Sequence, residues 1–217
     1  MARRDRDPSP VVPKAAAARL SLYLRFLESL REHGVPTTSS QKLAAGVGVT
    51  AAQVRKDLGY FGQFGLPGIG YRIDHLVDEL RRILGTDRTW NVALVGIGNL
   101  GSALAEYRGF ERQGFRFVAL FDRDPAIVGR AFGSLAVDSI ESVEPVVRVR
   151  GVELGIIAVP APAAQEVADL LVAAGIRGIY NFAPAVLQLP PQVAYVSIDL
   201  AVELEQLSFS VTQQRPT

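Results

Sequence analysis

The residues with the clearest chemical meaning are the glycines of Gly96-Ile97-Gly98-Asn99-Leu100-Gly101, which have the GxGxxG spacing of dinucleotide-binding loops. The segment follows a predicted strand over 90–95 and opens a predicted helix that runs to about residue 111. In such a loop the first glycine makes the turn, the second lets a pyrophosphate approach the backbone, and the third allows close packing of helix and strand. The free N–H groups of the helix then face the phosphates. The motif therefore predicts a dinucleotide site.

Asp122 stands 21 residues after Gly101, at the end of a second predicted strand over 115–121. A carboxylate at this position is expected on the ribose diol and would repel a 2′-phosphate, so it favours NAD over NADP. Arg123 and Arg130 lie close by in the sequence and weaken that preference. A Rossmann domain with no ligand, or with a different one such as coenzyme A, is the alternative.

Groups for acid–base catalysis are scarce in the second half of the chain. Residues 86–217 contain no lysine, histidine or cysteine. Hydride-transfer enzymes usually place an acid–base group beside the nicotinamide. Tyr107, Tyr180 and Tyr195 remain, but a tyrosine with a pKa of about 10 needs a helper at neutral pH. We therefore expect a nucleotide sensor with no catalytic residue, and keep an NAD-dependent oxidoreductase with a fused helix-turn-helix domain as the alternative.

A second group of informative residues lies in the first sixty positions. A helix is predicted over 15–32, and a short helix follows Thr38-Ser39-Ser40-Gln41, with Gln41 three residues after the proposed N-cap Thr38. A third helix starts at Thr50, again with a glutamine, Gln53, three residues later, and runs to about Tyr60. This order is typical of a helix-turn-helix. Four apolar residues have the spacing to pack its two helices together: Leu43, Val47, Val54 and Leu58.

The outer face of the third predicted helix suits a nucleic-acid groove. Ala52 and Gly59 are small enough for close approach, and Gln53, Arg55 and Lys56 supply hydrogen-bond donors for phosphates and base edges.

A wing is predicted after the helix-turn-helix. Pro67-Gly68 is a type II turn signal between β-prone segments, Phe64 before it and 69–73 after it, which predicts a small hairpin with Arg72 on or beside it. Asp74 is predicted to cap a helix over 75–84 that Gly85 ends. We place the domain boundary near residues 85–86.

Beyond the boundary, strands alternate with helices. Further strands are predicted over 136–140, 152–159, 178–182 and 193–198, with helices over 163–173 and 199–211. This alternation predicts a parallel, doubly wound sheet. The last helix carries an apolar stripe of Leu200, Leu204, Leu207 and Val211. It packs either on its own sheet or on a second subunit, and we favour the second subunit because helix-turn-helix proteins commonly read palindromes as two-fold dimers.

Composition limits the remaining classes. Residues 1–85 hold 13 Lys/Arg against 8 Asp/Glu, whereas residues 86–217 hold 10 against 14, so a basic half that suits a polyanion precedes an acidic half. Cysteine is absent, which excludes disulfides and cysteine-based zinc sites, and we expect no metal. No apolar run reaches the length of about 18 residues that a membrane helix needs, and no signal peptide is visible, so we expect a cytoplasmic protein.

Several segments together resemble the Rex family of redox-sensing transcriptional repressors. They are TSSQKLAAGVGVTAAQVRKDLGYFGQFGLPGIGY, LVGIGNLGSALAEY, FDRDP, GIIAVP, NFAP and SIDLAVELEQLSF. The resemblance covers residues 15–211. It implies a homodimer with winged-helix DNA-binding domains, Rossmann domains that bind NADH and NAD⁺, a C-terminal helix swapped between subunits, and release from inverted-repeat operators by NADH. Target genes in the family serve respiration and fermentation.

The resemblance and the motifs together assign the domains and sites. We expect a disordered tail (1–14), a winged-helix DNA-binding domain (15–85), a Rossmann NAD(H)-binding domain (86–198) and a C-terminal dimerisation helix and tail (199–217). The predicted DNA-binding residues are Ser39, Ser40, Gln53, Arg55, Lys56, Tyr60 and Arg72. The predicted cofactor-binding residues are Gly96, Ile97, Gly98, Asn99, Leu100, Gly101, Asp122, Arg123, Val159, Pro160, Asn181, Phe182, Tyr107 and Asp199.

The resemblance also implies a switch. Arg25, Tyr107 and Asp199 match three polar positions that report the nicotinamide state in a well-studied member of the family. That member has a phenylalanine in the nicotinamide pocket where this chain has Leu200, so the apolar character is retained and the aromatic stacking is not.

Overall fold

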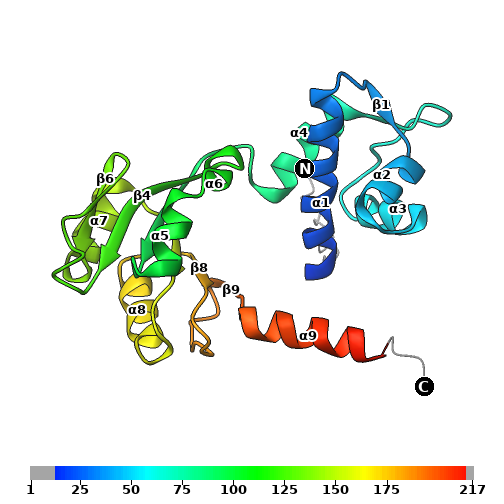
Figure 1. Ribbon diagram of the computed structural model, residues 1–217. Coiled ribbons are helices and arrows are strands. Elements are labelled where there is room, and N and C mark those ends of the chain that lie inside the picture. Colours follow the sequence, from blue (N-terminus) through cyan, green and yellow to red (C-terminus); the bar gives the residue numbers. More distant parts are fainter. Residues whose placement is uncertain (1–12, 214–217) are drawn as a thin grey trace, which may run out of the picture. The chain divides into compact units, whose positions relative to one another are not determined.

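The computed structural model describes residues 13–213 and divides into two compact units, one up to Arg88 and one from Thr89 onward (Figure 1). Of the predicted tail, residues 1–12 lie outside the described residues. Lys14 is the first residue of the first helix. None of the helices in the described range is both long and apolar enough to span a membrane.

Over its described residues, the first unit is built from four helices around one apolar core. Its elements are α1 (Lys14–Glu32), β1 (Thr37–Thr38), α2 (Ser40–Val47), α3 (Ala51–Gly59), β2 (Tyr71–Arg72) and α4 (Ile73–Leu84). Leu43, Val54 and Leu58 are buried in this core, and Val47 packs against it. The predicted packing of α2 on α3 is therefore confirmed.

The helix caps of this unit differ in part from the sequence prediction. The N-cap of α2 is Ser39, whose Oγ accepts the N–H of Lys42 at 3.1 Å, whereas Thr38 lies buried in β1. Thr38 does not cap α2, because its backbone is paired with Tyr71 of β2 in the two-stranded sheet. Asp74 lies inside the first turn of α4 and Arg72 is at the N-cap position, so the predicted Asp74 cap was wrong. Thr50 caps α3 and Gly85 ends α4 with a φ of 69°, as predicted.

The wing is smaller than predicted. The Leu66 carbonyl accepts the N–H of Ile69 at 3.1 Å and Gly68 has a φ of 76°, which are the features of a type II turn at Pro67-Gly68. Across the turn, Leu66 and Gly70 form a single antiparallel bridge, whereas β2 pairs antiparallel with β1. A Cβ at Gly70 would collide with the Thr38 carbonyl oxygen, so this glycine is what lets the chain pass so close to β1.

The second unit is a seven-stranded sheet with helices on both faces. Its strands are β3 (Trp90–Val95), β4 (Phe115–Asp122), β5 (Ala131–Phe132), β6 (Leu135–Ser139), β7 (Leu154–Ile157), β8 (Gly178–Asn181) and β9 (Ala194–Ser197). Its helices are α5 (Asn99–Glu106), α6 (Gly109–Arg112), the 3-10 turn η1 (Ile140–Ser142), α7 (Val143–Arg150), α8 (Ala161–Ala173) and α9 (Leu200–Gln213).

The order of the strands is β5-β6-β4-β3-β7-β8-β9, and all are parallel except the short β5. Alternate residues of β3 enter two different cores, one shared with α7 and α8 and the other with α5. The predicted doubly wound α/β fold is confirmed. In this order β3 and β7 are neighbours at the middle of the sheet. The chain leaves β3 toward β4 and leaves β7 toward β8, so the two connections run to opposite sides. Doubly wound folds bind their ligands at the carboxyl ends of two such strands.

Two helical segments differ from the prediction. The helix expected to reach residue 111 is broken, because Tyr107 leaves the helical conformation with a ψ of 102° and α6 starts again at Gly109. Helix α7 was not predicted, since its valine-rich sequence favours a strand. Val143 and Val147, four residues apart, are both buried in the core and hold this segment as a helix.

Helix α9 has no buried residue, and each of its side chains is exposed. Leu204 is 67% exposed and Phe209 is 65% exposed. The alternative in which this helix packs on its own sheet was therefore wrong for the single chain.

Candidate nucleotide site and DNA-reading face

The glycine loop between β3 and α5 has three glycines with different local surroundings. Gly96 has a φ of 90°, and a Cβ there would lie 2.6 Å from the Ala158 carbonyl oxygen. At Gly101 a Cβ would collide with the Gly96 carbonyl oxygen. At Gly98, the N-cap of α5, a Cβ would meet nothing within 4 Å. Two glycines are therefore required by the turn and by packing, and the third faces open space at the helix N-terminus, which is the cradle that a pyrophosphate needs.

Asp122 is held firmly beside this loop. Its Oδ2 accepts the N–H of Ile97 at 2.6 Å, and its Oδ1 accepts the N–H of Asp124 at 2.9 Å. The residue is 9% exposed, at the end of β4. Each carboxylate oxygen can still accept another hydrogen bond. The side chain is thus fixed in position with the capacity to bind a sugar hydroxyl.

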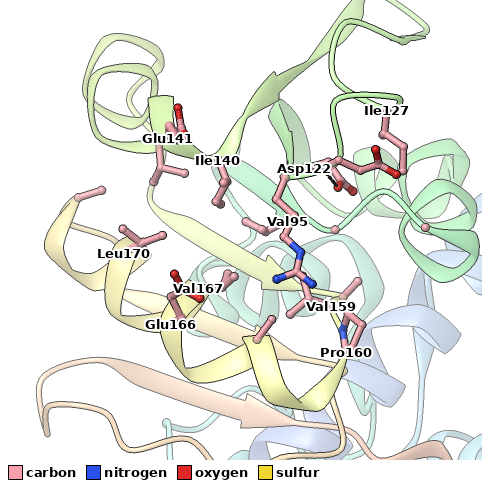
Figure 2. A pocket seen from close by; sticks show the side chains of 18 of the residues that line it. Val95, Asp122, Ile127, Ile140, Glu141, Val159, Pro160, Glu166, Val167 and Leu170 are labelled. Atoms are coloured by element: carbon pink, nitrogen blue, oxygen red, sulfur yellow. Dashed lines mark hydrogen bonds between the residues drawn. The ribbon is translucent and has the colours of Figure 1, made fainter.

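A cavity of about 690 Å³ opens next to the loop and Asp122. Figure 2 shows Asp122 and Ile127 along one part of its lining and Val167 and Leu170 of α8 along another. The volume lies in the range of small-molecule sites, and the lining is mainly apolar. Six of the predicted cofactor residues line it: Gly96, Gly98, Asp122, Arg123, Val159 and Pro160.

The cavity also has walls that the sequence did not reveal. Ile140 and Val143 come from η1 and the start of α7, and Val167 and Leu170 come from α8. Their apolar character matches an aromatic ring. No short motif marks these residues, because they reach the cavity from elements that lie far apart in the sequence.

Asn181 and Phe182 do not line this cavity. Asn181 is fully buried, its Nδ2 donates to the Ala183 and Ala185 carbonyls at 2.9 and 3.1 Å, and its Oδ1 accepts the N–H of Ala183 at 2.9 Å. The backbone N–H of Phe182 donates to the Ile157 carbonyl at 2.9 Å. The structure therefore gives the Asn181 side chain the role of shaping the loop after β8.

Tyr107 and Asp199 also lie outside the cavity. Tyr107 is 59% exposed, packs edge-on against Phe110 at 5.2 Å, and lines a different hollow of about 620 Å³. Asp199 caps α9, since its Oδ1 accepts the N–H of Ala201 at 2.9 Å. Arg25 is exposed on α1 in the first unit. Ile97, Asn99, Leu100 and Gly101 belong to the glycine loop without lining the cavity.

In the first unit, α3 presents an exposed face with small and basic residues. Arg55 and Lys56 are exposed, and so are Ala52 and Gly59. Arg55 donates from Nη1 to the Ser40 Oγ at 2.9 Å, which orients the guanidinium and leaves its other donors free of this bond. The face can approach a groove and donate to phosphates or base edges.

The other predicted DNA-binding residues belong to α2, α3 and β2 or lie directly beside them in the chain. Ser39 caps α2, Arg72 is exposed on β2, and Tyr60 is half-buried directly after α3. Gln53 points elsewhere, because its Nε2 donates to the Asp57 Oδ1 at 2.8 Å.

Asp57 is the residue that sequence reasoning missed. It is fully buried, and it accepts hydrogen bonds from Arg19 and Tyr23 of α1 as well as from Gln53. Burial alone would raise the pKa of Asp57, but the hydrogen bonds from Arg19, Tyr23 and Gln53 outweigh burial and lower it from its ordinary value. Burial, followed by the bond to Asp57, raises the pKa of Tyr23 to about 12. The sequence did hold one signal for this residue: Asp57 is the acidic residue of an otherwise basic helix, directly after Arg55 and Lys56.

The two units therefore define a class of protein in which a helix-turn-helix reader is joined to a dinucleotide-binding fold. Family models agree with this division. Residues 11–59 match a model described as the N-terminus of putative DNA-binding proteins, and residues 87–185 match a model described as a CoA binding domain. Within the described residues, no group of three or more His, Cys, Asp or Glu side chains could hold a metal ion.

Individual relatives narrow the class. The chain is 52% identical to the redox-sensing transcriptional repressor Rex of Carboxydothermus hydrogenoformans, over 92% of this chain and 96% of that protein. It is 47% identical to the Rex of Streptomyces coelicolor, over 96% and 81%. A crystal structure of RSP in complex with β-NAD⁺ and operator DNA matches with a TM-score of 0.89 at 38% identity, covering 94% of each chain. The chain belongs to the Rex family of redox-sensing transcriptional repressors.

Proposed function

We propose that this protein is a transcriptional repressor that responds to NADH and NAD⁺. It binds inverted-repeat operator DNA as a homodimer in the cytoplasm, is released by NADH, and controls respiratory and fermentative genes. It acts as a regulator and not as an enzyme. The observation that carries the proposal is the combination of an open glycine loop beside Asp122 with a basic reading helix in a single chain of the Rex family.

The residues of the second unit fit a dinucleotide. The N–H groups of the Gly98 loop and of the α5 N-terminus would hold the pyrophosphate, and Asp122 would accept from the ribose hydroxyls. The apolar walls at Ile140 and Val167 would take the adenine ring. RSP is described in complexes with both β-NAD⁺ and β-NADH, which favours NAD over coenzyme A as the ligand of this cavity.

The DNA contacts are assigned to the exposed face of α3 and its surroundings. Arg55 and Lys56 would enter the major groove, Ser39 and Ser40 would meet phosphates near the N-terminus of α2, and Arg72 would follow the backbone beside the wing. Tyr60 would lie at the edge of this contact. Gln53 is given a positioning role, because its amide is bound to Asp57.

The dimer contact is assigned to α9. Leu200, Leu204, Leu207 and Val211 are each more than half exposed, and an exposed apolar face of this length marks an association surface. We propose that a second copy of the chain covers it by exchange of this helix between subunits. The exchange would also carry Asp199, at the start of the helix, into the partner.

The redox response is assigned to Arg25, Tyr107 and Asp199. Nicotinamide carries a positive charge when oxidised and none when reduced. The Rex resemblance implies that Leu200 contributes to an apolar nicotinamide pocket. Such a pocket would disfavour the cation, because burying an unpaired charge is costly. We propose that Arg25, Tyr107 and Asp199 together relay the state of the nicotinamide to the reader, so that NADH favours a dimer whose two reading helices no longer match successive major grooves.

Fluorescence anisotropy tests the proposed function. The protein is titrated onto a labelled duplex with a TTGTG…CACAA inverted repeat, and NADH and NAD⁺ are then added separately at constant salt. We expect binding to the repeat, with release by NADH at concentrations where NAD⁺ leaves the complex intact. A protein that does not bind, or that binds and ignores NADH, would refute the proposal, and turnover of an NADH-linked substrate would favour an oxidoreductase.

Linkage adds a quantitative requirement. If NADH weakens DNA binding by a given factor, DNA must weaken NADH binding by the same factor. Matched titrations with unequal factors would refute a two-state mechanism.

A further inference from the structure

The reading helix α3 is joined to α1 by a polar cluster of four residues around a buried carboxylate, called here the Asp57 cluster: Arg19, Tyr23, Gln53 and Asp57. Arg19 donates to both carboxylate oxygens, from Nε to Oδ2 at 2.6 Å and from Nη2 to Oδ1 at 2.8 Å. The Tyr23 hydroxyl donates to Oδ2 at 2.8 Å, and the Gln53 Nε2 donates to Oδ1 at 2.8 Å. Asp57 and Tyr23 are both fully buried.

This cluster is better suited to fixing geometry than to adding stability. A buried ion pair gains little over apolar side chains of the same volume, because desolvation offsets the attraction. Its hydrogen bonds, however, require defined directions and distances. The surrounding core is made of side chains such as Leu20, Val54 and Leu58, and apolar contacts of this kind are not directional. The hydrogen bonds to Asp57 therefore add directional constraints on the rotation and the sliding of α3 against α1.

The same cluster lies directly behind the reading face. Asp57 follows Arg55 and Lys56 in α3, so a rotation of the helix that moved Asp57 would move both basic side chains. On α1, the exposed Arg25 comes two residues after the buried Tyr23. The hydrogen bonds to Asp57 therefore connect the part of α1 that carries Arg25 to the helix that carries Arg55 and Lys56.

We propose that Arg19, Tyr23 and Asp57 are positioning residues for operator recognition, which hold α3 in its reading orientation and make α1 and α3 move as one body. The proposal rests on the proposed function, in which α3 reads DNA and Arg25 receives the redox signal. None of the three residues needs to touch DNA or nucleotide.

The test uses the full-length protein with Tyr23→Phe, which removes one hydrogen bond to Asp57 and keeps the aromatic ring. Arg19→Lys is the second variant, because it retains the charge but lacks the planar fork that binds both carboxylate oxygens. The matched control is Glu28→Gln. Glu28 lies on the same helix and binds Arg81 of α4 at 2.6 Å, so this change weakens an α1 ion pair that does not involve α3.

Four quantities are measured for each variant, at a temperature well below its melting transition. They are the affinity for the inverted-repeat duplex, the affinity for a scrambled duplex, the affinity for NADH from its own fluorescence, and the melting temperature. The ratio of the first two affinities reports recognition, and a loss of folded protein alone does not change it.

We expect Tyr23→Phe and Arg19→Lys to lower the operator-to-scrambled ratio about tenfold, with NADH affinity unchanged, and to reduce the factor by which NADH weakens operator binding. Glu28→Gln should leave the ratio and the NADH factor unchanged even where it lowers the melting temperature. The inference is overturned if the two cluster variants keep the wild-type ratio, or if Glu28→Gln lowers the ratio equally. Failure of the proposed function is distinguishable, because it would already appear in the wild-type protein.

Discussion

Replacement of Asp122 by asparagine tests the assignment of the nucleotide site most directly. In the wild-type protein the carboxylate accepts one hydrogen bond on each oxygen, from the N–H of Ile97 at 2.6 Å and from the N–H of Asp124 at 2.9 Å. Asparagine has almost the same shape but only one acceptor oxygen, and its NH₂ group is a donor. Asp122→Asn therefore keeps one of the two bonds and turns a donor toward the other N–H.

The loss of the bond between Asp122 and the Ile97 N–H sets the size of the effect. Ile97 is buried, so leaving a donor there without its partner costs about 1–3 kcal/mol. The bond to the ribose hydroxyl also loses the negative charge that strengthens it. In the free variant the glycine loop can relax and lose this strain, but nucleotide binding requires the original loop shape. The cost of the lost hydrogen bond then weakens nucleotide binding, and NADH affinity should fall about 10- to 100-fold.

Binding of NADH and NADPH is measured by the fluorescence of the reduced nicotinamide. Asp122→Asn should weaken NADH binding but improve the relative binding of NADPH, because the carboxylate that repels the 2′-phosphate is gone. Asp169→Asn is the matched control, since this acid is exposed on α8 and accepts from Gln165 without lining the cavity. It should leave both affinities unchanged.

Two results would refute the reasoning about Asp122. NADH affinity unchanged in the asparagine variant would show that the carboxylate does not contribute to the site. Equal losses for NADH and NADPH would restrict Asp122 to shaping the glycine loop and would remove it from the ribose.

Three further predictions concern the glycine loop, the buried cluster and the last helix. Gly98→Ala should leave the melting temperature nearly unchanged but abolish NADH binding, because its methyl group enters the open space at the loop. Gly101→Ala should instead lower the free energy of unfolding by at least about 2 kcal/mol, because its methyl group collides with the backbone. Thermal melts and NADH fluorescence distinguish the two variants. The pKa of Tyr23 is raised to about 12, so its hydroxyl ionises first in the unfolded chain. Its contribution to stability is therefore complete below pH 10 and falls by about 2 kcal/mol between pH 10 and pH 12. Urea unfolding should show a smaller decline in Tyr23→Phe, and an identical decline would contradict the buried position of this hydroxyl. The double change Leu204→Glu and Leu207→Glu should convert the dimer to a monomer in analytical ultracentrifugation without altering the melting of the first unit, and a dimer that persists would remove α9 from the subunit interface.

The local signals in the sequence predicted much of the fold. The strand before the glycine motif, the cap at Thr50, the end of α4 at Gly85 and the type II turn at Pro67-Gly68 all occur where their residues indicate. Each depends on contacts within a few residues, so the short-range preferences of glycine, proline, threonine and apolar side chains were sufficient. The alternation of strands and helices was likewise enough to establish a doubly wound sheet.

Features that depend on distant parts of the chain were not predictable in this way. Helix α7 exists because Val143 and Val147 meet a core assembled from other elements, against the strand preference of its valines. The surroundings of Asn181 are a second example, because its Nδ2 also lies 3.3 Å from the Ser197 hydroxyl and 3.4 Å from the Tyr195 hydroxyl of the neighbouring strand β9.

The contrast is clearest in QVRKDL, the segment that carries the reading helix. The sequence alone determined that this segment is a helix with a basic outer face, because helix periodicity and side-chain charge are local properties. Only the tertiary structure decided that Asp57 is buried and that Gln53 donates a hydrogen bond to it. The buried charge is compensated by Arg19 and Tyr23, which belong to a helix more than thirty residues earlier. A buried carboxylate is tolerated only where such partners converge, and convergence over that distance is a property of the fold and not of any short stretch of sequence.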